Sequence, residues 1–135
     1  MERTFVIIKP DAVEKHIIGD IISFFERNGL IISEMRMLRL KRKEAEELYS
    51  VHRDKSFYHD LVNFIISGPI VAMVLEGEGA IERVREIIGA TDPKKAIAGT
   101  IRAKFGTSIQ VNAVHASDSI ESYKREAPIV FRDLI

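Results

Sequence analysis

A histidine with small neighbours is the residue of this sequence best placed to do chemistry. His115 lies in residues 111–119, "VNAVHASDS", where large side chains are missing on both sides, so its imidazole should be easy to approach. Asp118 followed by Glu121 resembles a capping box, which predicts a helix start just after the histidine. Such a helix end favours a bound anion. A nucleophilic histidine beside it can accept a phosphoryl group; a histidine that merely hydrogen-bonds at a strand end is the simpler alternative.

Phosphoryl transfer also needs positive charge near the transferring oxygens. The sequence has neither G-x-x-x-x-G-K-[ST] nor G-x-G-x-x-G, so side chains must supply that charge instead of a glycine-rich loop. Lys9 ends the apolar run "FVIIKP", Arg85 lies in the helix-like "IERVREIIG", and Arg102 lies in the loop-like "GTIRAKF". Thr91 is a further loop candidate. Taken alone, each is a weak signal, because exposed residues of these types are common.

Other kinds of active site are poorly supported. The four histidines, at positions 16, 52, 59 and 115, show no H-E-x-x-H or similar spacing, and there is no cysteine, so we expect no metal held by protein ligands. No G-x-S-x-G elbow marks a serine hydrolase. Twenty basic residues balance twenty acidic ones, which argues against broad binding of nucleic acid or anionic membrane.

Length and composition indicate one soluble domain. The 135 residues are 46% hydrophobic and 30% charged, so we expect residues 1–135 to form a single domain around one core. The N-terminus enters a strand-like run at once without a secretory leader, and the longest apolar runs are too short to span a bilayer. With no cysteine there are no disulfides. These features favour a cytoplasmic protein without membrane contact.

Strand-like runs of β-branched and aromatic residues alternate with amphipathic segments along the chain. Their order favours an α+β fold, a ferredoxin-like αβ sandwich with a four-stranded antiparallel sheet and helices on its face. Residues 90–106 are expected to be mostly loop. We expect strands at residues 4–10, 30–40, 69–77 and 108–115, and helices at residues 18–29, 41–52, 56–68, 80–89 and 118–126.

Four stretches of the chain resemble one family, the nucleoside diphosphate kinases. They are "VIIKPDAV", "SGPIVAMVLEG", "GATDPKKAIAGTIRAKFG" and "NAVHASDS", in matching order and spacing over nearly the whole chain. The pattern N-x-x-H-[GA]-S-D in the last stretch is highly specific. The resemblance implies an Mg²⁺-dependent enzyme that transfers the γ-phosphoryl group of a nucleoside triphosphate, typically ATP, to a nucleoside diphosphate. Such an enzyme works by a ping-pong mechanism through a phosphohistidine and maintains nucleotide and deoxynucleotide triphosphate pools.

The resemblance assigns the catalytic roles residue by residue. His115 would carry the phosphoryl group, Glu126 would orient its ring, and Ser117 would bond to that glutamate. Lys9 would reach the transferring group, and Tyr49 would lie near the lysine. No protein ligand to a metal is implied, since Mg²⁺ would be held mainly by the nucleotide phosphates.

The same matching implies how nucleotides bind. Phe57 would stack on the base, which suits an enzyme that serves all nucleotides, because every base offers a π-face. Lys9 and Asn112 would hold the sugar hydroxyls. The phosphates would be gripped by Arg85, Thr91 and Arg102.

Several positions depart from the common pattern of this family. Ala98 stands where a proline is often found, which predicts a looser loop at the subunit contacts. His16 stands where glycine is usual. The other departures are Val51, Gln110, Val111 and Lys104. None of them belongs to the implied nucleotide-binding set.

Two other functions are compatible with parts of the sequence. One is a catalytically weak relative that serves as a binding or regulatory subunit, which the complete set of implied phosphate contacts opposes. The other is an RNA-binding module on a ferredoxin-like sheet, which the neutral charge and the missing aromatic strand motif oppose. The resemblance further implies a homo-oligomer, a tetramer or hexamer of a common dimer. Because the chain ends soon after its last helix, we expect no long C-terminal extension that braces neighbouring subunits.

Overall fold

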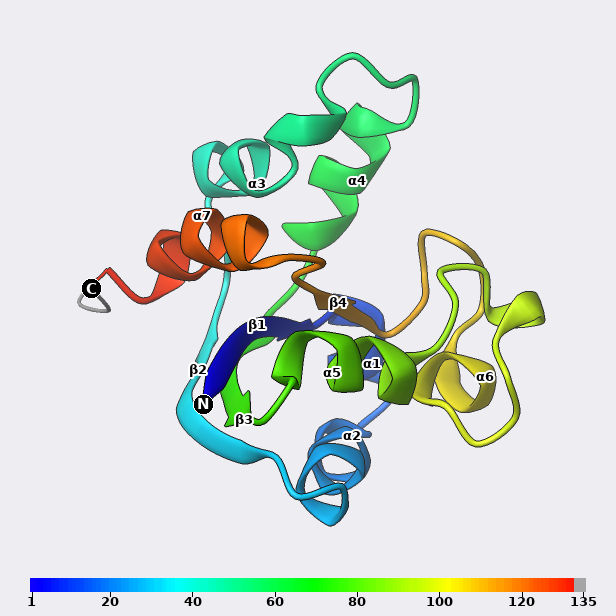
Figure 1. Cartoon of the computed structure of the whole chain (residues 1–135). Helices are drawn as coiled ribbons and strands as arrows, with labels where there is room; N and C mark the ends of the chain where they lie inside the picture. The colour runs from blue at the N-terminus through cyan, green and yellow to red at the C-terminus, as the bar shows by residue number, and fades with distance from the viewer. Residues whose placement is uncertain (133–135) are drawn as a thin grey trace.

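Four strands form one antiparallel sheet in the computed structural model, which describes residues 1–132 (Figure 1). The strands are β1 (Glu2–Ile8), β2 (Ile31–Leu38), β3 (Ile70–Gly77) and β4 (Val114–Ala116). Their order across the sheet is β2–β3–β1–β4, so β1 and β3 are the inner strands. β1 pairs with β3 along its whole length and with β4 over three residues.

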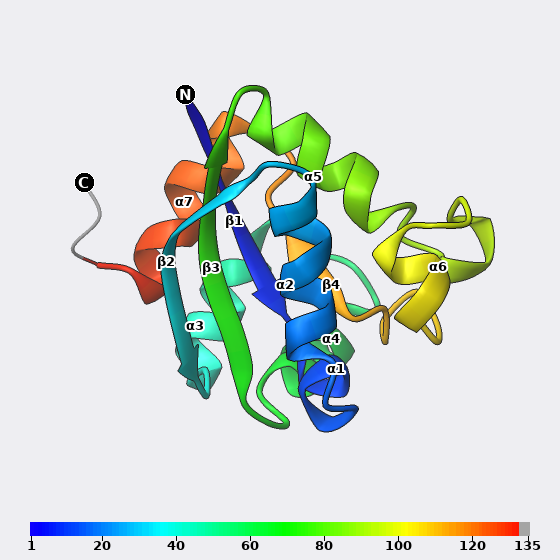
Figure 2. The ribbon, with the colours of Figure 1, turned by 90° about the horizontal axis from the view of Figure 1, so that it is seen from below.

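Both inner strands are apolar on both faces, and this composition requires a helical layer on each side of the sheet. Phe5 and Ile7 of β1 face one layer, whereas Val6 and Ile8 face the other, and all four are fully buried. Figure 2 shows the sheet between the two layers. The first layer contains α3 (Arg42–Leu48), α4 (Tyr58–Ile65) and α7 (Ile120–Val130). The second contains α1 (Pro10–Glu14), α2 (Ile18–Arg27), α5 (Ala80–Ile88) and α6 (Ile101–Phe105).

The ferredoxin-like α+β fold expected from the sequence is confirmed by this strand order and pairing. The helices, however, cover both faces of the sheet. A single covered face would leave Val6 and Ile8 in water, and burying each such side chain stabilises the fold by about 1.5–3 kcal/mol. The continuous apolar run of β1 is therefore the sequence feature that demands the second layer.

The strand expected at residues 108–115 is wrong over most of its length. Only the residues from Val114 onward pair with β1. The segment before them turns instead, because the Ser108 amide donates to the Val111 carbonyl at 3.1 Å and Ala113 adopts a φ of 77°. β-propensity does not register a turn that contains no glycine or proline. β4 is consequently a short strand held at one edge.

Short helices are the other elements that differ from expectation. The first strand, expected at residues 4–10, ends at Ile8, and Pro10 begins α1, where its missing N–H has no intrahelical role. Residues 90–106, expected to be mostly loop, contain η2 (Pro93–Lys95) and α6. The helix expected at residues 41–52 is divided: α3 ends at Leu48, and a separate 3₁₀ turn, η1 (Ser50–His52), follows it.

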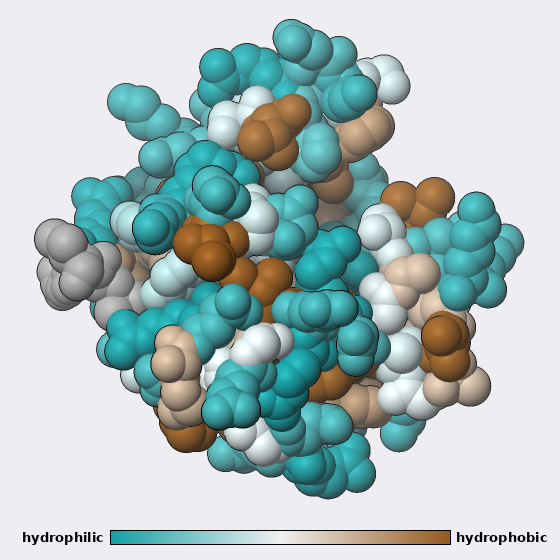
Figure 3. Space-filling view, in the orientation of Figure 1, coloured by the Kyte–Doolittle hydropathy of each residue, from teal (hydrophilic) through white to brown (hydrophobic). Residues whose placement is uncertain are grey.

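β2 lies at the edge of the sheet and is more exposed than its alternating pattern predicts. Ile31, Met35 and Met37 keep 52%, 54% and 57% of their surface in water. In Figure 3 tan and brown atoms lie at the lower left, where Figure 1 shows the N-terminus beside β2. An edge strand with exposed apolar side chains is a surface that a further chain can cover.

The turn at Ile97–Thr100 provides a test of the loop. The Thr100 amide donates to the Ile97 carbonyl at 3.2 Å, and Gly99 has a φ of 96°, which makes this a type II turn with Ala98 at its second position. Proline fits that position, so we expect Ala98→Pro to stabilise the fold by about 0.4–1 kcal/mol and thereby to raise the thermal midpoint. Calorimetry of the two proteins measures the shift.

Gly99→Ala is the matched control in the same turn. An L-residue is strained at this φ, so this variant should lower the thermal midpoint. If Ala98→Pro also lowers the thermal midpoint while the oligomer state is unchanged, the turn is not of type II.

Candidate active site

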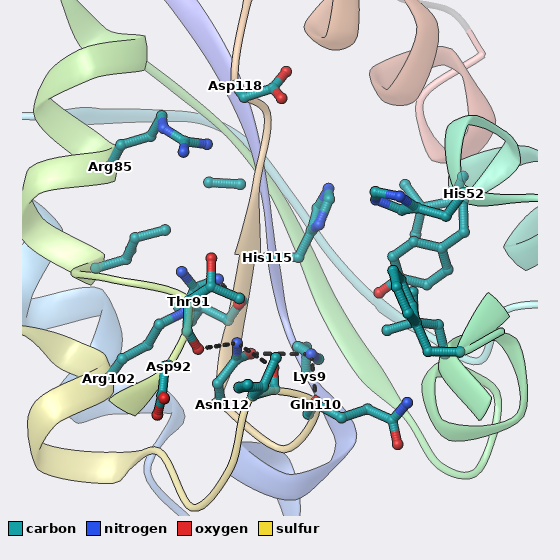
Figure 4. A pocket seen from close by; sticks show the side chains of 18 of the residues that line it. Lys9, His52, Arg85, Thr91, Asp92, Arg102, Gln110, Asn112, His115 and Asp118 are labelled. Atoms are coloured by element: carbon teal, nitrogen blue, oxygen red, sulfur yellow. Dashed lines mark hydrogen bonds between the residues drawn. The ribbon is translucent and has the colours of Figure 1, made fainter. Parts of the chain in front are cut away.

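A cleft of about 980 Å³ lies beside β4 and is seen from close by in Figure 4. It is bounded by the segment from η1 to α4 on one side and by α5 and the loop through η2 on the other. Every site residue predicted from the sequence except Ser117 lines this cleft. These lining residues are Lys9, Tyr49, Phe57, Arg85, Thr91, Arg102, Asn112, His115 and Glu126. The fold thus brings together side chains from segments far apart in sequence.

The imidazole of His115 projects into the middle of the cleft from β4. Its Nε2 lies 2.9 Å from Oε1 of Glu126, and the side chain is 20% exposed. A ring whose Nε2–H donates to a carboxylate has its lone pair on Nδ1. Within residues 1–132, Nδ1 has no hydrogen-bond partner, so it is the nitrogen that can act as a nucleophile.

Glu126 on α7 is almost fully buried and has three partners. Oε1 accepts from Ser117 Oγ at 2.9 Å as well as from His115, and Oε2 pairs with the Arg125 guanidinium at 3.2 Å. Arg125 also donates to the carbonyls of Glu47 and Leu48 at the end of α3. The sequence pattern did not identify Arg125, because a basic residue beside an acidic one on a helix is usually exposed.

The helix that follows His115 begins differently from the capping box expected at Asp118 and Glu121. Ser119 is the N-cap, since its hydroxyl accepts from the Ser122 amide at 3.0 Å. Asp118 instead accepts from the Ser122 hydroxyl, and this bond lowers the pKa of the Asp118 carboxyl. The expected helix start is correct, but the residue that caps it was wrong by one position.

Lys9 is the most deeply buried cation of the cleft. It follows β1 directly, and its Nζ donates to the Gln110 carbonyl at 2.7 Å and to Asn112 Oδ1 at 3.0 Å. Burial lowers the pKa of Lys9 to about 8, while the charge of Asp11 raises it and that of Arg102 lowers it further. The ammonium therefore remains largely protonated at neutral pH but titrates within two units of it.

Two further arginines of the cleft, Arg102 and Arg85, differ in how firmly they are held. Arg102 on α6 is buried and donates to the carbonyls of Gly89 and Val114, at 3.0 and 2.8 Å. Burial lowers the pKa of Arg102 to about 10, with the nearby Arg85 acting in the same direction, so the charge is retained at neutral pH. Arg85 on α5 is exposed and reaches into the cleft opposite His115 (Figure 4).

Asn112 connects both sides of the floor of the cleft. Its Oδ1 accepts from Lys9, and its Nδ2 donates to the carbonyls of Thr91 and Ile109 at 3.0 and 2.8 Å. The side chain is only 2% exposed, so these bonds fix its orientation. The Thr91 side chain remains exposed at the rim.

Aromatic side chains form the other wall. Phe57, just before α4, keeps 44% of its surface in water, which is unusual for a large apolar residue. Its ring lies 5.6 Å from that of His52. Tyr49 packs edge-on against the His115 ring at 6.0 Å, and burial raises the pKa of the Tyr49 hydroxyl, so it stays protonated. Sequence reasoning missed His52 and Leu61, although Leu61 lies one helical turn after Phe57.

No group of three or more His, Cys, Asp or Glu side chains in residues 1–132 is arranged to hold a metal ion. None of the helices in this part of the chain has the length and apolar character needed to cross a membrane.

Comparisons with known proteins agree over nearly the full length. A family model described as nucleoside diphosphate kinase matches residues 2–134. The nucleoside diphosphate kinase of Hyperthermus butylicus is 56% identical over 133 residues, which cover 98% of this chain and 94% of that protein. The solved structure of the Aquifex aeolicus nucleoside diphosphate kinase superposes with a TM-score of 0.94 at 50% identity, covering 96% of this chain and 94% of that one. A halophilic nucleoside diphosphate kinase from Halobacterium salinarum, solved in complex with CDP, gives 0.93 at 42% identity, covering 96% and 87%.

Matches of this length and identity define the class of protein first: a kinase, a transferase of nucleotide metabolism. The chain belongs to the nucleoside diphosphate kinase family. Its activity is therefore nucleoside diphosphate kinase activity, and the family resemblance found in the sequence is confirmed.

The burial of Lys9 makes a prediction for the stability of the free protein. The pKa is about 8 in the folded state but near the ordinary 10.5 in the unfolded chain. Between these two pKa values the unfolded chain holds more protons than the folded protein. The contribution of Lys9 to the free energy of unfolding therefore rises with pH in this range. The gain is at most about 1.4 kcal/mol per pH unit. Below pH 8 the lysine is charged in both states and gives no slope.

Urea unfolding of the wild type and of Lys9→Met at pH 7, 8, 9 and 9.5 isolates this contribution. The stability of the wild type relative to the variant should be constant up to about pH 8 and increase above it. Parallel profiles across the whole range would mean that Lys9 titrates at its ordinary pKa.

Proposed function

We propose that this kinase transfers the γ-phosphoryl group of a nucleoside triphosphate, typically ATP, to a nucleoside diphosphate through a phosphohistidine on His115. The observation that carries the proposal is the bond from Nε2 to Glu126, which leaves the Nδ1 lone pair facing the cleft. This chemistry would maintain the nucleotide and deoxynucleotide triphosphate pools.

Each half of the reaction is a displacement at phosphorus. The Nδ1 lone pair attacks the γ-phosphorus, the bond to the β–γ bridging oxygen breaks, and the first diphosphate leaves. A terminal oxygen of the second diphosphate then attacks the phosphohistidine, and the N–P bond electrons return to Nδ1. The hydrogen bond to Glu126 keeps the proton on Nε2 throughout, and the carboxylate stabilises the positive charge that develops on the ring. Ser117 holds the carboxylate in place.

The nucleotide contacts follow the lining of the cleft. The exposed face of Phe57 would stack on the base, and the contact would tolerate any base. Lys9 and Asn112, already hydrogen-bonded to each other, would hold the sugar hydroxyls, and Lys9 with Tyr49 beside it would face the transferring group. The phosphates would be bound by Arg85, Thr91 and Arg102. The CDP complex of the Halobacterium salinarum relative supports nucleotide binding on this fold.

Mg²⁺ fits this site as a partner of the nucleotide and not of the protein. Of the carboxylates that line the cleft in residues 1–132, Glu126 is engaged by three partners, and Asp92 and Asp118 form no metal-binding group. Mg²⁺ typically binds nucleotide phosphates while keeping several waters. When bound, the ion neutralises charge on the phosphate oxygens. Arg85 and Lys9 supply positive charge from the protein side.

We further propose that residues 1–135 form a single kinase domain that works in the cytoplasm. The family model spans residues 2–134, and the sequence has no cysteine that an oxidising compartment would pair. Recovery of the activity in the membrane fraction of lysed cells would contradict the location.

The chain is also proposed to form a homo-oligomer, a tetramer or a hexamer of a common dimer. Support comes from the uncovered edge β2 with Ile31, Met35 and Met37, and from Ile97 in the loop, which is 80% exposed. We expect light scattering to give the mass of four or six chains of 15.3 kDa. A stable monomer at micromolar concentration would contradict the proposal.

The central test is the phosphohistidine itself. Incubation with ATP labelled at the γ-position and Mg²⁺ should place one phosphoryl group on His115, and any nucleoside diphosphate should remove it. An N–P bond predicts label that is lost in acid and kept in base. His115→Gln should abolish the exchange and retain nucleotide binding, because binding depends on other side chains.

Phe57→Ala provides the opposite control. It should weaken binding of purine and pyrimidine diphosphates alike, by about 1–3 kcal/mol, yet leave His115 able to accept the group at saturating ATP. Acid-stable label, or undiminished turnover in His115→Gln, would overturn the mechanism.

A further inference from the structure

The backbone makes a strained turn between Asn112 and His115. Ala113 has a φ of 77°, and the Val114 amide donates to the Asn112 carbonyl at 2.9 Å across it. These two features define a γ-turn of the rarer kind, which is unfavourable for any residue with a Cβ. The turn sets the distance and the angle between Asn112 and the strand that carries His115.

A strained conformation persists only where its surroundings hold it. Both polar groups of Ala113 are held by the segment that follows β1. Its N–H donates to Oδ2 of Asp11 at 3.0 Å, and its carbonyl accepts from the Lys9 amide at 2.8 Å. Ala113 is fully buried and Asp11 is 9% exposed, so water cannot replace these bonds.

We propose that Asp11 is a positioning residue for phosphoryl transfer, which acts by holding the Ala113 turn and thereby the relative placement of Asn112 and His115. The inference rests on the proposed function, in which those two residues bind the sugar and carry the phosphoryl group.

Asp11 is unusual for a residue with a purely structural task. It stands in the first turn of α1, yet its carboxylate bonds a turn 102 residues further along the chain, and its second oxygen is buried without a partner in residues 1–132. Burying such a group is costly, and a shorter or neutral side chain would avoid the cost. The charge is offset by Lys9, whose pKa it raises. Asp11 therefore supports two groups, the buried Ala113 amide through a hydrogen bond and the Lys9 ammonium of the cleft through its charge.

The test compares four proteins with the wild type at a temperature where all are folded. Asp11→Ala removes the acceptor, whereas Asp11→Asn keeps a weaker one. Asp20→Ala removes an exposed carboxylate from the first turn of α2 and controls for the loss of an acidic residue at a helix start. Asp11→Ala combined with Ala113→Gly adds a residue that adopts a positive φ without strain. The readouts are the single-turnover rate of His115 phosphorylation by ATP and Mg²⁺, the steady-state kcat and KM, and the thermal midpoint.

We expect Asp11→Ala to slow phosphorylation by about tenfold to a hundredfold, Asp11→Asn severalfold, and Asp20→Ala not at all. The glycine should restore part of the rate in the double variant, because the turn no longer needs to be held. A structural role alone would lower the thermal midpoint without this rescue.

The proposal is overturned if Asp11→Ala has the kcat and KM of Asp20→Ala, or if it loses only thermal stability. It is also overturned if the glycine restores nothing. If Asp11→Ala does not fold, the pair Asp11→Asn and Asp11→Asn with Ala113→Gly carries the same comparison. A wild type that accepts no phosphoryl group on His115 would refute the proposed function itself, and labelling in the wild type separates the two results.

Discussion

The buried carboxylate of Glu126 is the interaction on which the site depends. A carboxylate that is 4% exposed is stable only when it is paired and hydrogen-bonded, and His115, Ser117 and Arg125 together satisfy it. Because these partners belong to β4, to the residue after it and to α7, the carboxylate fixes the short edge strand against the helix above it. The same bond commits one ring nitrogen of His115 and so determines which nitrogen faces the cleft.

Several charges in this fold are buried, and the backbone makes that possible. Lys9 and Arg102 donate to carbonyls at the ends of elements, where helices and turns leave acceptors free. Desolvation lowers the pKa of both, yet each stays charged at neutral pH. A cation already held in a water-poor cleft needs little reorganisation when a phosphate arrives, which is the condition under which electrostatic stabilisation is most effective. The cost in stability and the gain in function thus have the same origin.

The sequence was sufficient for the first three strands, the larger helices and the candidate residue His115, because apolar periodicity and a specific motif both report local chemistry. It was insufficient for features that depend on tertiary contacts. The shortness of β4 follows from the Ala113 turn, which Asp11 holds from the other end of the chain. Arg125 gains its role from the carboxylate beside it and from the end of α3. Ser117, Asp118 and Ser119 could each cap this helix by residue type. Ser119 is the N-cap because its hydroxyl accepts from the Ser122 amide.

Three of the departures from the pattern that the resemblance implied concern the backbone, whereas Val51, another of them, lines the cleft. His16, where glycine is usual, has a φ of 61°, a left-handed conformation that costs a residue with a Cβ about 1–2 kcal/mol. Ala98 occupies a turn position that proline would restrict further. At position 110 Lys9 contacts the backbone carbonyl, so that bond does not depend on the Gln110 side chain. These three positions therefore act on the scaffold, while the arrangement around His115 depends on the bonds that Glu126 makes with His115, Ser117 and Arg125.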